Sequence, residues 1–144
     1  MVYYSVRDEI IEVVNKLFVY TDRQDWEKLK EEVFTHEVLF DMSSMGGENA
    51  EKTSEEICAL WKDGFKGIDA INHLAGNHIV QIHETTATVF VYATATHYKE
   101  KAVHGKTREF AGSYELALMK HGPGWRIYQF KYILKYMTGN SALT

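Results

Sequence analysis

Residues 85–99, TTATVFVYATATHYK, decide the fold class of this chain of 144 residues. β-Branched and aromatic side chains fill the stretch, which is typical of one long strand. Two further stretches of this kind follow, REFAGSYELALMK at 108–120 and WRIYQFKYILKYM at 125–137. A polar segment at 100–106 and the turn His121-Gly122-Pro123-Gly124 separate them. The second half of the chain therefore predicts antiparallel strands with no helix between them.

Residues 70–83 predict one more strand, just before this set. Gly76 inside it indicates a bulge, and Gly112 has a similar interior position in the strand at 108–120. Bends at such glycines allow a sheet to curve around its own core. The mostly polar residues 138–144 predict a frayed tail.

Helical patterns lie at the other end of the chain. Ser5 followed by Asp8 predicts a helix N-cap with an acidic first turn. Apolar residues at helical spacing continue this helix to about Tyr20 or Asp22. Asp25 can cap a short second helix, DWEKLKEEV, whose buried side is formed by Trp26, Leu29 and Val33.

A strand at 37–42 and a loop at 43–49 follow, and then a capping box of Thr53 and Glu56 begins a third helix. We expect one face of that helix to carry Ile57, Leu60 and Trp61. Helices first and strands afterwards define an α+β protein. We therefore predict a single domain over residues 1–144, with its core at about 5–138.

Composition and charge exclude several classes of function. The net charge is -4 and no basic stripe occurs, so we expect no nucleic-acid partner. We also expect no membrane partner, because the chain has no apolar run of spanning length and its first twelve residues lack a signal-peptide core. The single cysteine, Cys58, cannot form an internal disulfide, which fits a cytoplasmic location.

No metal or organic cofactor is expected either. The sequence contains no HExxH, CxxC or EF-hand pattern, and its seven histidines have no metal-ligand spacing. Gly105-Lys106-Thr107 is similar to the end of a phosphate-binding loop, but Glu100 stands where that loop needs a glycine. We interpret this segment as a hairpin connection.

Two residues are candidates for chemistry. Asp22 stands at the predicted end of the first helix, where the negative end of the helix dipole disfavours a carboxylate. His73 stands in an otherwise apolar strand. Each has a plainer interpretation, because Asp22 can be a solvated loop acid and His73 a core residue with its hydrogen bonds satisfied.

The two residues lie in segments that resemble a known family. YTDRQDWEKLKEEVFTHEVLFDM at 20–42 resembles the opening of SnoaL-like polyketide cyclases in the nuclear transport factor 2-like superfamily. INHLAGN at 71–77 resembles a strand of scytalone dehydratase and bile-acid dehydratase, and hexachlorocyclohexane dehydrochlorinase is similar. This resemblance implies a cone-shaped α+β barrel of the cystatin-like kind, with three N-terminal helices on a strongly curved antiparallel sheet. The resemblance also implies that Asp22 corresponds to the family's aspartate and His73 to its histidine.

The resemblance also has departures. His36 replaces an aspartate that the family has at the end of the second helix, and Ala95 replaces a strand acid of bile-acid dehydratase. A strand arginine of that enzyme falls near Leu134, beside Lys135. The second histidine of scytalone dehydratase aligns best with His97. No single enzyme's full catalytic set is reproduced.

On this basis we expect a lyase or isomerase that needs no cofactor and catalyses a dehydration, an elimination or a proton shift. Asp22 would fix the tautomer of His73, which would act as general base. Tyr20, Tyr92 or Tyr114 could donate to a developing oxyanion. Further ligand contacts are expected from Trp61, His97 and Phe110. In the strand that contains Tyr92, either that residue's face or the face of Ala95 and His97 could line the pocket.

The alternative is a non-catalytic module that binds a small hydrophobic or aromatic ligand or pairs with a protein. Apolar residues occur on both faces of the strands at 87–96 and 114–119. Burial of both faces suggests a homodimer through the convex face of the sheet. Trp61 can likewise be a core anchor and not a pocket residue.

Overall fold

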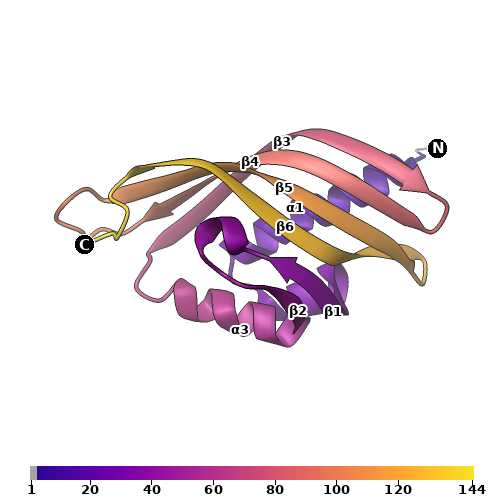
Figure 1. Ribbon diagram of the computed structural model, residues 1–144, viewed down its shortest axis with the longest axis horizontal. Coiled ribbons are helices and arrows are strands. Elements are labelled where there is room, and N and C mark those ends of the chain that lie inside the picture. The colour runs from indigo at the N-terminus through magenta and orange to yellow at the C-terminus, as the bar shows by residue number, and fades with distance from the viewer. Residues whose placement is uncertain (1–2) are drawn as a thin grey trace.

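The computed structural model describes residues 3–144 and places helices beside one six-stranded sheet, which confirms the α+β class (Figure 1). Met1 and Val2 lie outside the described residues. They belong to the first twelve residues, in which the sequence shows no signal-peptide core. The helical segments are α1 (Val6–Asp22), α2 (Trp26–Lys28), the π-helical turn η1 (Leu29–Val33), the 3-10 turn η2 (Ser43–Met45) and α3 (Ser54–Gly64). The strands are β1 (Phe34–Asp41), β2 (Asn49–Thr53), β3 (Ala70–His83), β4 (Thr86–Tyr98), β5 (Thr107–His121) and β6 (Gly124–Gly139).

Side-chain caps begin the helices as predicted. Ser5 and Asp8 form a capping box at α1, and Thr53 and Glu56 form one at α3. The Asp25 carboxylate accepts a hydrogen bond from the Lys28 amide, but α2 continues into the π-helical turn η1. No helix formed by residues 3–144 is long and apolar enough to cross a bilayer.

One expectation for α3 is wrong. Leu60 is half exposed, and the buried face of the helix carries Ile57 and Cys58, with Trp61 partly buried against the core.

The sheet has the order β2-β1-β6-β5-β4-β3. Strands β3 to β6 pair antiparallel with their neighbours, as predicted, but β1 runs parallel to β6. Strand β2 was not expected, and it pairs antiparallel with β1 at the edge of the sheet. The sheet is curved, as predicted, and it is not closed, because β2 and β3 form its two separate edges in the described chain.

Both predicted glycine bends are present. The β3–β4 register shifts between Gly76 and Ile79, and the β5–β6 register shifts between Ala111 and Gly112. A Cβ atom on Gly112 would lie 2.5 Å from the Tyr132 hydroxyl oxygen and 2.4 Å from the Ile133 carbonyl oxygen. The absence of a side chain at Gly112 therefore allows the Tyr132 ring to lie across β5.

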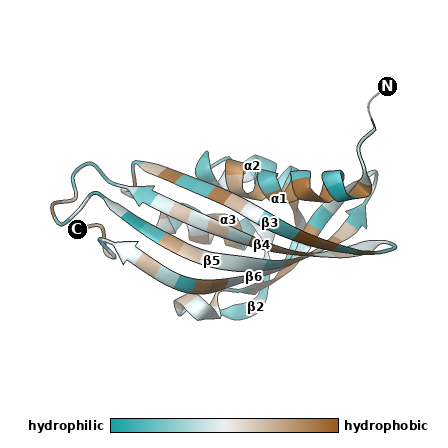
Figure 2. Cartoon of the chain, turned by 90° about the horizontal axis from the view of Figure 1, so that it is seen from above, coloured by the Kyte–Doolittle hydropathy of each residue, from teal (hydrophilic) through white to brown (hydrophobic). Residues whose placement is uncertain are grey.

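Strand alternation decides which face of β4 is the inner one. Val91, Ala93, Ala95 and His97 are buried, whereas the residues between them are more exposed. The inner face packs against α1, which runs behind the long strands in Figure 1. Figure 2 shows the alternation as polar and apolar bands along β3 to β6.

The C-terminal residues are docked, which contradicts the predicted frayed tail. Leu143 is only 3% exposed. The Asn140 side-chain amide donates to the carbonyl oxygens of Gly105 and Thr144, and the His104 amide also donates to Thr144. The end of the chain therefore lies beside the β4–β5 connection (Figure 1).

Candidate active site

A cavity of about 160 Å³ lies between α1, α3 and the inner face of the sheet. Its walls are aromatic and aliphatic, with two histidines and two tyrosines as the strongest polar groups. The lining residues are Leu17, Phe18, Thr21, Met42, Met45, Trp61, Phe65, His73, Ala95, His97, Phe110, Tyr114, Phe130 and Tyr132. An apolar cavity with a few convergent polar groups is the usual form of a small-molecule site.

Asp22 contacts His73, which lines this cavity. Asp22 is the last residue of α1, and His73 lies in the neighbouring strand β3. The two carboxylate oxygens divide the contacts: Oδ2 accepts the backbone N–H of His73 at 2.9 Å, and Oδ1 lies 2.5 Å from Nδ1 of its ring. The side chain of Asp22 is 17% exposed and that of His73 is 9% exposed. Because a carboxylate can only accept, Nδ1 carries a proton, and the neutral form of this imidazole therefore has its lone pair on Nε2.

His97 provides a second imidazole on the same wall. The Nε–H of Arg108 in β5 donates to His97 Nδ1 at 3.1 Å. Burial, together with the nearby charge of Arg108, lowers the pKa of His97 to about 4. His97 is therefore neutral at physiological pH.

Tyr114 and Tyr132 supply hydroxyl groups beside the histidines. Their rings lie 4.8 Å apart, and both residues are buried. Burial raises the pKa of both phenols, so each remains a protonated hydrogen-bond donor. Tyr114 also packs edge-on against Phe18, whose ring stacks on His73 at 5.4 Å between centroids.

The sequence-predicted residues separate into three groups, of which the third consists of two tyrosines. Trp61, His73, His97, Phe110 and Tyr114 line the cavity together. Asp22 lies behind His73 and holds it from outside the lining.

Two predicted tyrosines lie elsewhere. The Tyr20 hydroxyl donates to Glu32, away from the cavity lining. Tyr92 is 43% exposed on the outer face of β4, where the Lys135 ammonium lies 5.1 Å from the centre of its ring. Neither residue is placed to contact a ligand in the cavity.

The SnoaL-like domain model matches residues 3–131 of this sequence. The chain belongs to the SnoaL-like family. The match spans both α1 and the strands that carry the two histidines, so the resemblance noted in the sequence is confirmed for the family. A comparison with curated proteins gave no match.

Solved structures share the fold of this SnoaL-like domain. The Kfla4162 protein from Kribbella flavida has a TM-score of 0.88 and 24% identity, over 95% of each chain. The "Putative Scytalone Dehydratase" from Novosphingobium aromaticivorans has a TM-score of 0.77 and 16% identity, over 92% of this chain and 85% of the other. A LinA-type3 hexachlorocyclohexane dehydrochlorinase from Novosphingobium barchaimii has a TM-score of 0.78 and 11% identity, over 94% and 90%.

A nuclear transport factor 2-like protein from Salmonella enterica has the same fold, with a TM-score of 0.73 and 16% identity over 94% of this chain and 95% of the other. The predicted fold is thereby confirmed. At such identities the likeness shows the fold of the SnoaL-like domain and leaves its chemistry to the site itself.

Several lining residues of the SnoaL-like domain were missed by sequence reasoning. Phe18 stands four residues after Val14 and three before Thr21. This helical spacing places it on the buried face of α1 and could have identified it. Tyr132 gave no such signal. Ala117 pairs with Gln129 and Leu118 with Ile127, so one extra residue of β6 reverses the alternation before Tyr132.

No cluster of three or more His, Cys, Asp or Glu side chains that could hold a metal ion occurs within residues 3–144 of the SnoaL-like domain. The strongest polar groups of its cavity are therefore the imidazoles and the phenols described above.

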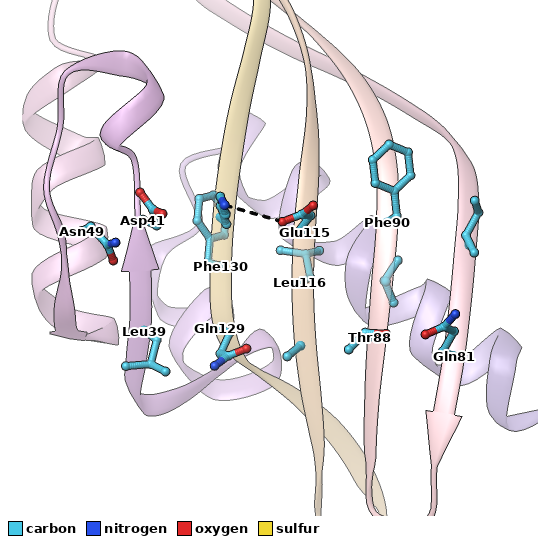
Figure 3. Close-up of a pocket in the computed structure, with 14 residues that line it drawn as sticks. Leu39, Asp41, Asn49, Gln81, Thr88, Phe90, Glu115, Leu116, Gln129 and Phe130 are labelled. Atoms are coloured by element: carbon cyan, nitrogen blue, oxygen red, sulfur yellow. Dashed lines mark ion pairs between the residues drawn. The ribbon is translucent and has the colours of Figure 1, made fainter.

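A larger hollow, of about 610 Å³, lies on the outer face of the sheet (Figure 3). Leu39, Phe90 and Gln81 project into it from three different strands. Its ion pair, Glu115–Lys131 at 3.9 Å, has side chains about half exposed to solvent. Water screens such charges, so the buried groups of the smaller inner cavity are better suited to proton chemistry.

Proposed function

We propose that this SnoaL-like domain is a cofactor-independent lyase or isomerase that removes a proton from a small hydrophobic ligand. His73 is the general base, and Asp22 positions it. The observation that carries this proposal is the double contact of one carboxylate with the backbone N–H and the ring Nδ1 of His73, at the wall of an aromatic cavity.

The contact has a direct chemical consequence. With its proton on Nδ1, His73 has its Nε2 lone pair available to take a proton from a C–H or O–H group of the ligand. Asp22 then stabilises the imidazolium that forms, since its carboxylate lies 2.5 Å from Nδ1. A general base placed in this way contributes roughly 10²–10⁴-fold in rate.

The oxygen of the ligand requires its own partner during this step. Removal of a proton beside a carbonyl places negative charge on the carbonyl oxygen. Tyr114 and Tyr132 supply protonated hydroxyl groups in the same cavity. In an elimination, the proton held by His73 returns to solvent or to the departing hydroxyl group. The reaction is therefore a dehydration, an elimination or a proton shift.

The cavity limits the size of the ligand. A volume of about 160 Å³ is close to that of an engineered protein cavity of about 150 Å³ that takes up benzene. Phe18, Phe110 and Phe130 provide aromatic walls. The ligand that fits best has one ring and small substituents.

The names of two structural relatives support this class of reaction. One is called a putative scytalone dehydratase and the other a hexachlorocyclohexane dehydrochlorinase, and both names describe eliminations. Because a shared fold does not fix an activity, the Asp22–His73 contact remains the principal support.

The test uses 3-hydroxycyclohexanone, a one-ring β-hydroxyketone whose dehydration gives an enone with strong ultraviolet absorbance. Proton exchange next to the carbonyl of cyclohexanone is followed in D₂O by NMR, which also detects a proton shift without elimination. We expect the wild type to accelerate at least one of these reactions and His73→Ala to lose that acceleration. Tyr92→Phe, on the outer face, is the matched control and should retain it. Equal rates for the wild type and His73→Ala would refute the proposal.

A second candidate is a non-catalytic, cytoplasmic homodimer that binds a hydrophobic ligand and pairs through the outer face of its sheet. Exposed apolar side chains favour this face, since Leu74, Ile79 and Tyr136 are more than half exposed on β3 and β6. Light scattering at micromolar concentration tests the pairing. A dimer that Leu74→Glu converts to a monomer supports this candidate, and a monomeric wild type rejects it.

A further inference from the structure

The hydrogen bond between Arg108 and His97 fixes the position of one proton. An arginine side chain has five N–H donors and no acceptor. His97 Nδ1, which lies 3.1 Å from Arg108 Nε, must therefore be the acceptor. A neutral imidazole has only one N–H, so the proton of His97 lies on Nε2.

The surroundings of His97 favour this neutral form. Burial is the largest influence and lowers the pKa of His97, and the charge of Arg108 acts in the same direction. The rings of Phe65 and Phe110 pack against the imidazole, with centroids at 5.7 and 5.2 Å. Among the described residues, Nε2 of His97 has no hydrogen-bond partner.

The strand register places His97 close to His73. His73 pairs with Ala95, and Ile71 pairs with His97, so both histidines project from the same face of neighbouring strands. Diagonal neighbours of this kind lie about 7–8 Å apart. Both histidines line the cavity, and the small side chain of Ala95 lies beside them. A one-ring ligand can therefore reach both histidines.

Arg108 is itself held from a distant part of the chain. One of its terminal nitrogens donates to the Ser141 carbonyl oxygen at 2.9 Å, and its guanidinium lies 5.5 Å from the centre of the Phe110 ring. Asn140 fixes this C-terminal segment against the β4–β5 connection. The guanidinium is therefore held beside His97 by the Ser141 carbonyl and the Phe110 ring.

We propose that Arg108 is a positioning residue that keeps His97 as a neutral N–H donor, and that the cavity selects one-ring ligands with an uncharged acceptor oxygen, a carbonyl or a hydroxyl, to receive that bond. This inference rests on the proposed function only for the identity of the ligand. Binding through His97 leaves the proton-abstracting nitrogen of His73 free.

The tautomer is tested directly by ¹⁵N NMR of the labelled histidines, without any assay of activity. Two variants isolate the hydrogen bond. Arg108→Gln places an amide N–H₂ where Nε stands, whereas Arg108→Met places a methyl group there. We expect the Nε2–H tautomer of His97 in the wild type and in Arg108→Gln, and a mixture of tautomers in Arg108→Met. A wild-type Nδ1–H tautomer, or an unchanged tautomer in Arg108→Met, overturns the role of Arg108.

Ligand selection is tested with acetophenone and α-methylstyrene, which have nearly the same shape and differ in the carbonyl oxygen. One hydrogen bond corresponds to about five-fold in affinity, so wild-type protein should bind acetophenone about five-fold more tightly. His97→Phe should abolish this preference. Equal affinity of the wild type for both compounds overturns the proposed selection. The turnover of His73→Ala tests only the proposed reaction, because this variant keeps His97 and should keep the preference for acetophenone.

Discussion

His73 and His97 face one cavity with opposite hydrogen bonding at Nδ1: the Nδ1 of His73 donates to Asp22, and the Nδ1 of His97 accepts from Arg108. The free Nε2 atoms therefore differ, because one carries a lone pair and the other a proton. Hydrogen bonds that place the two ring protons differently suit one neutral imidazole to the role of base and the other to the role of donor.

The first prediction concerns Asp22→Asn. An asparagine can offer its N–H₂ group to Nδ1 of His73, which moves the ring proton to Nε2 and removes the base. We expect a fall of roughly 10²–10⁴-fold in kcat/KM, the usual contribution of general base catalysis, with little change in the free energy of unfolding. The measurement is the kinetic assay of 3-hydroxycyclohexanone, with urea unfolding as the check on the fold. A variant within three-fold of the wild type would show that Asp22 does not position the base.

The second prediction concerns the pH dependence of stability. The pKa of His97 is lowered from its ordinary value of 6.5 to about 4 in the folded protein. Between these values the unfolded chain binds more protons, so stability falls as pH falls from about 6.5 to 4. The full shift in the pKa of His97 corresponds to a loss on the order of 3 kcal/mol in the free energy of unfolding.

His97→Gln isolates this contribution, because glutamine does not titrate in this range. Urea unfolding at pH 7 and at pH 4.5 should show a smaller loss of stability for the variant than for the wild type. The same loss in both proteins would assign the acid sensitivity to other groups.

The third prediction compares two glycines. A Cβ atom on Gly112 would meet the Tyr132 hydroxyl and the Ile133 carbonyl, whereas nothing lies within 4 Å of a Cβ atom on Gly76. Overpacking of this kind costs about 1–3 kcal/mol, so Gly112→Ala should lower the free energy of unfolding by at least that amount. Gly76→Ala is the control and should change it little. Equal effects of the two substitutions in urea unfolding would contradict the close approach of Tyr132 to β5.

Local signals predicted much of the fold. The capping residues Ser5 and Thr53 act within one turn of helix, so both helix starts could be read from the sequence. Strand β2 could not, because its residues NAEKT are mostly polar and it is defined by pairing with β1 at the edge of the sheet. Whether a sheet closes depends on contacts between distant strands, which no local pattern contains.

The candidate site shows the same difference between what sequence segments indicate and what only contacts between strands decide. Asp22 and His73 were found because each stands in a segment with a family resemblance, and the structure brings them into contact. The Arg108–His97 contact depends on the register of β4 and β5, in which these two residues are direct partners. Tyr92 was a candidate only while the inner face of β4 was undecided.

The last prediction links the C-terminal segment to the cavity. Asn140 donates to Gly105 and Thr144, and this segment supplies the Ser141 carbonyl that accepts from Arg108. Asn140→Ala removes both side-chain bonds, which should release the segment and increase amide hydrogen exchange at His104 by about ten-fold. Ser141→Ala keeps the backbone acceptor and serves as the control.

The release should also reach His97. With Ser141 no longer fixed, Arg108 loses one of its two hydrogen bonds and holds Nδ1 of His97 less strictly. Asn140→Ala should therefore increase the population of the Nδ1–H tautomer of His97 and weaken the preference for acetophenone over α-methylstyrene. If hydrogen exchange at His104 rises while the His97 tautomer stays fixed, Arg108 is held by its contacts with His97 and Phe110 alone, and the C-terminal segment is not part of the support for the cavity.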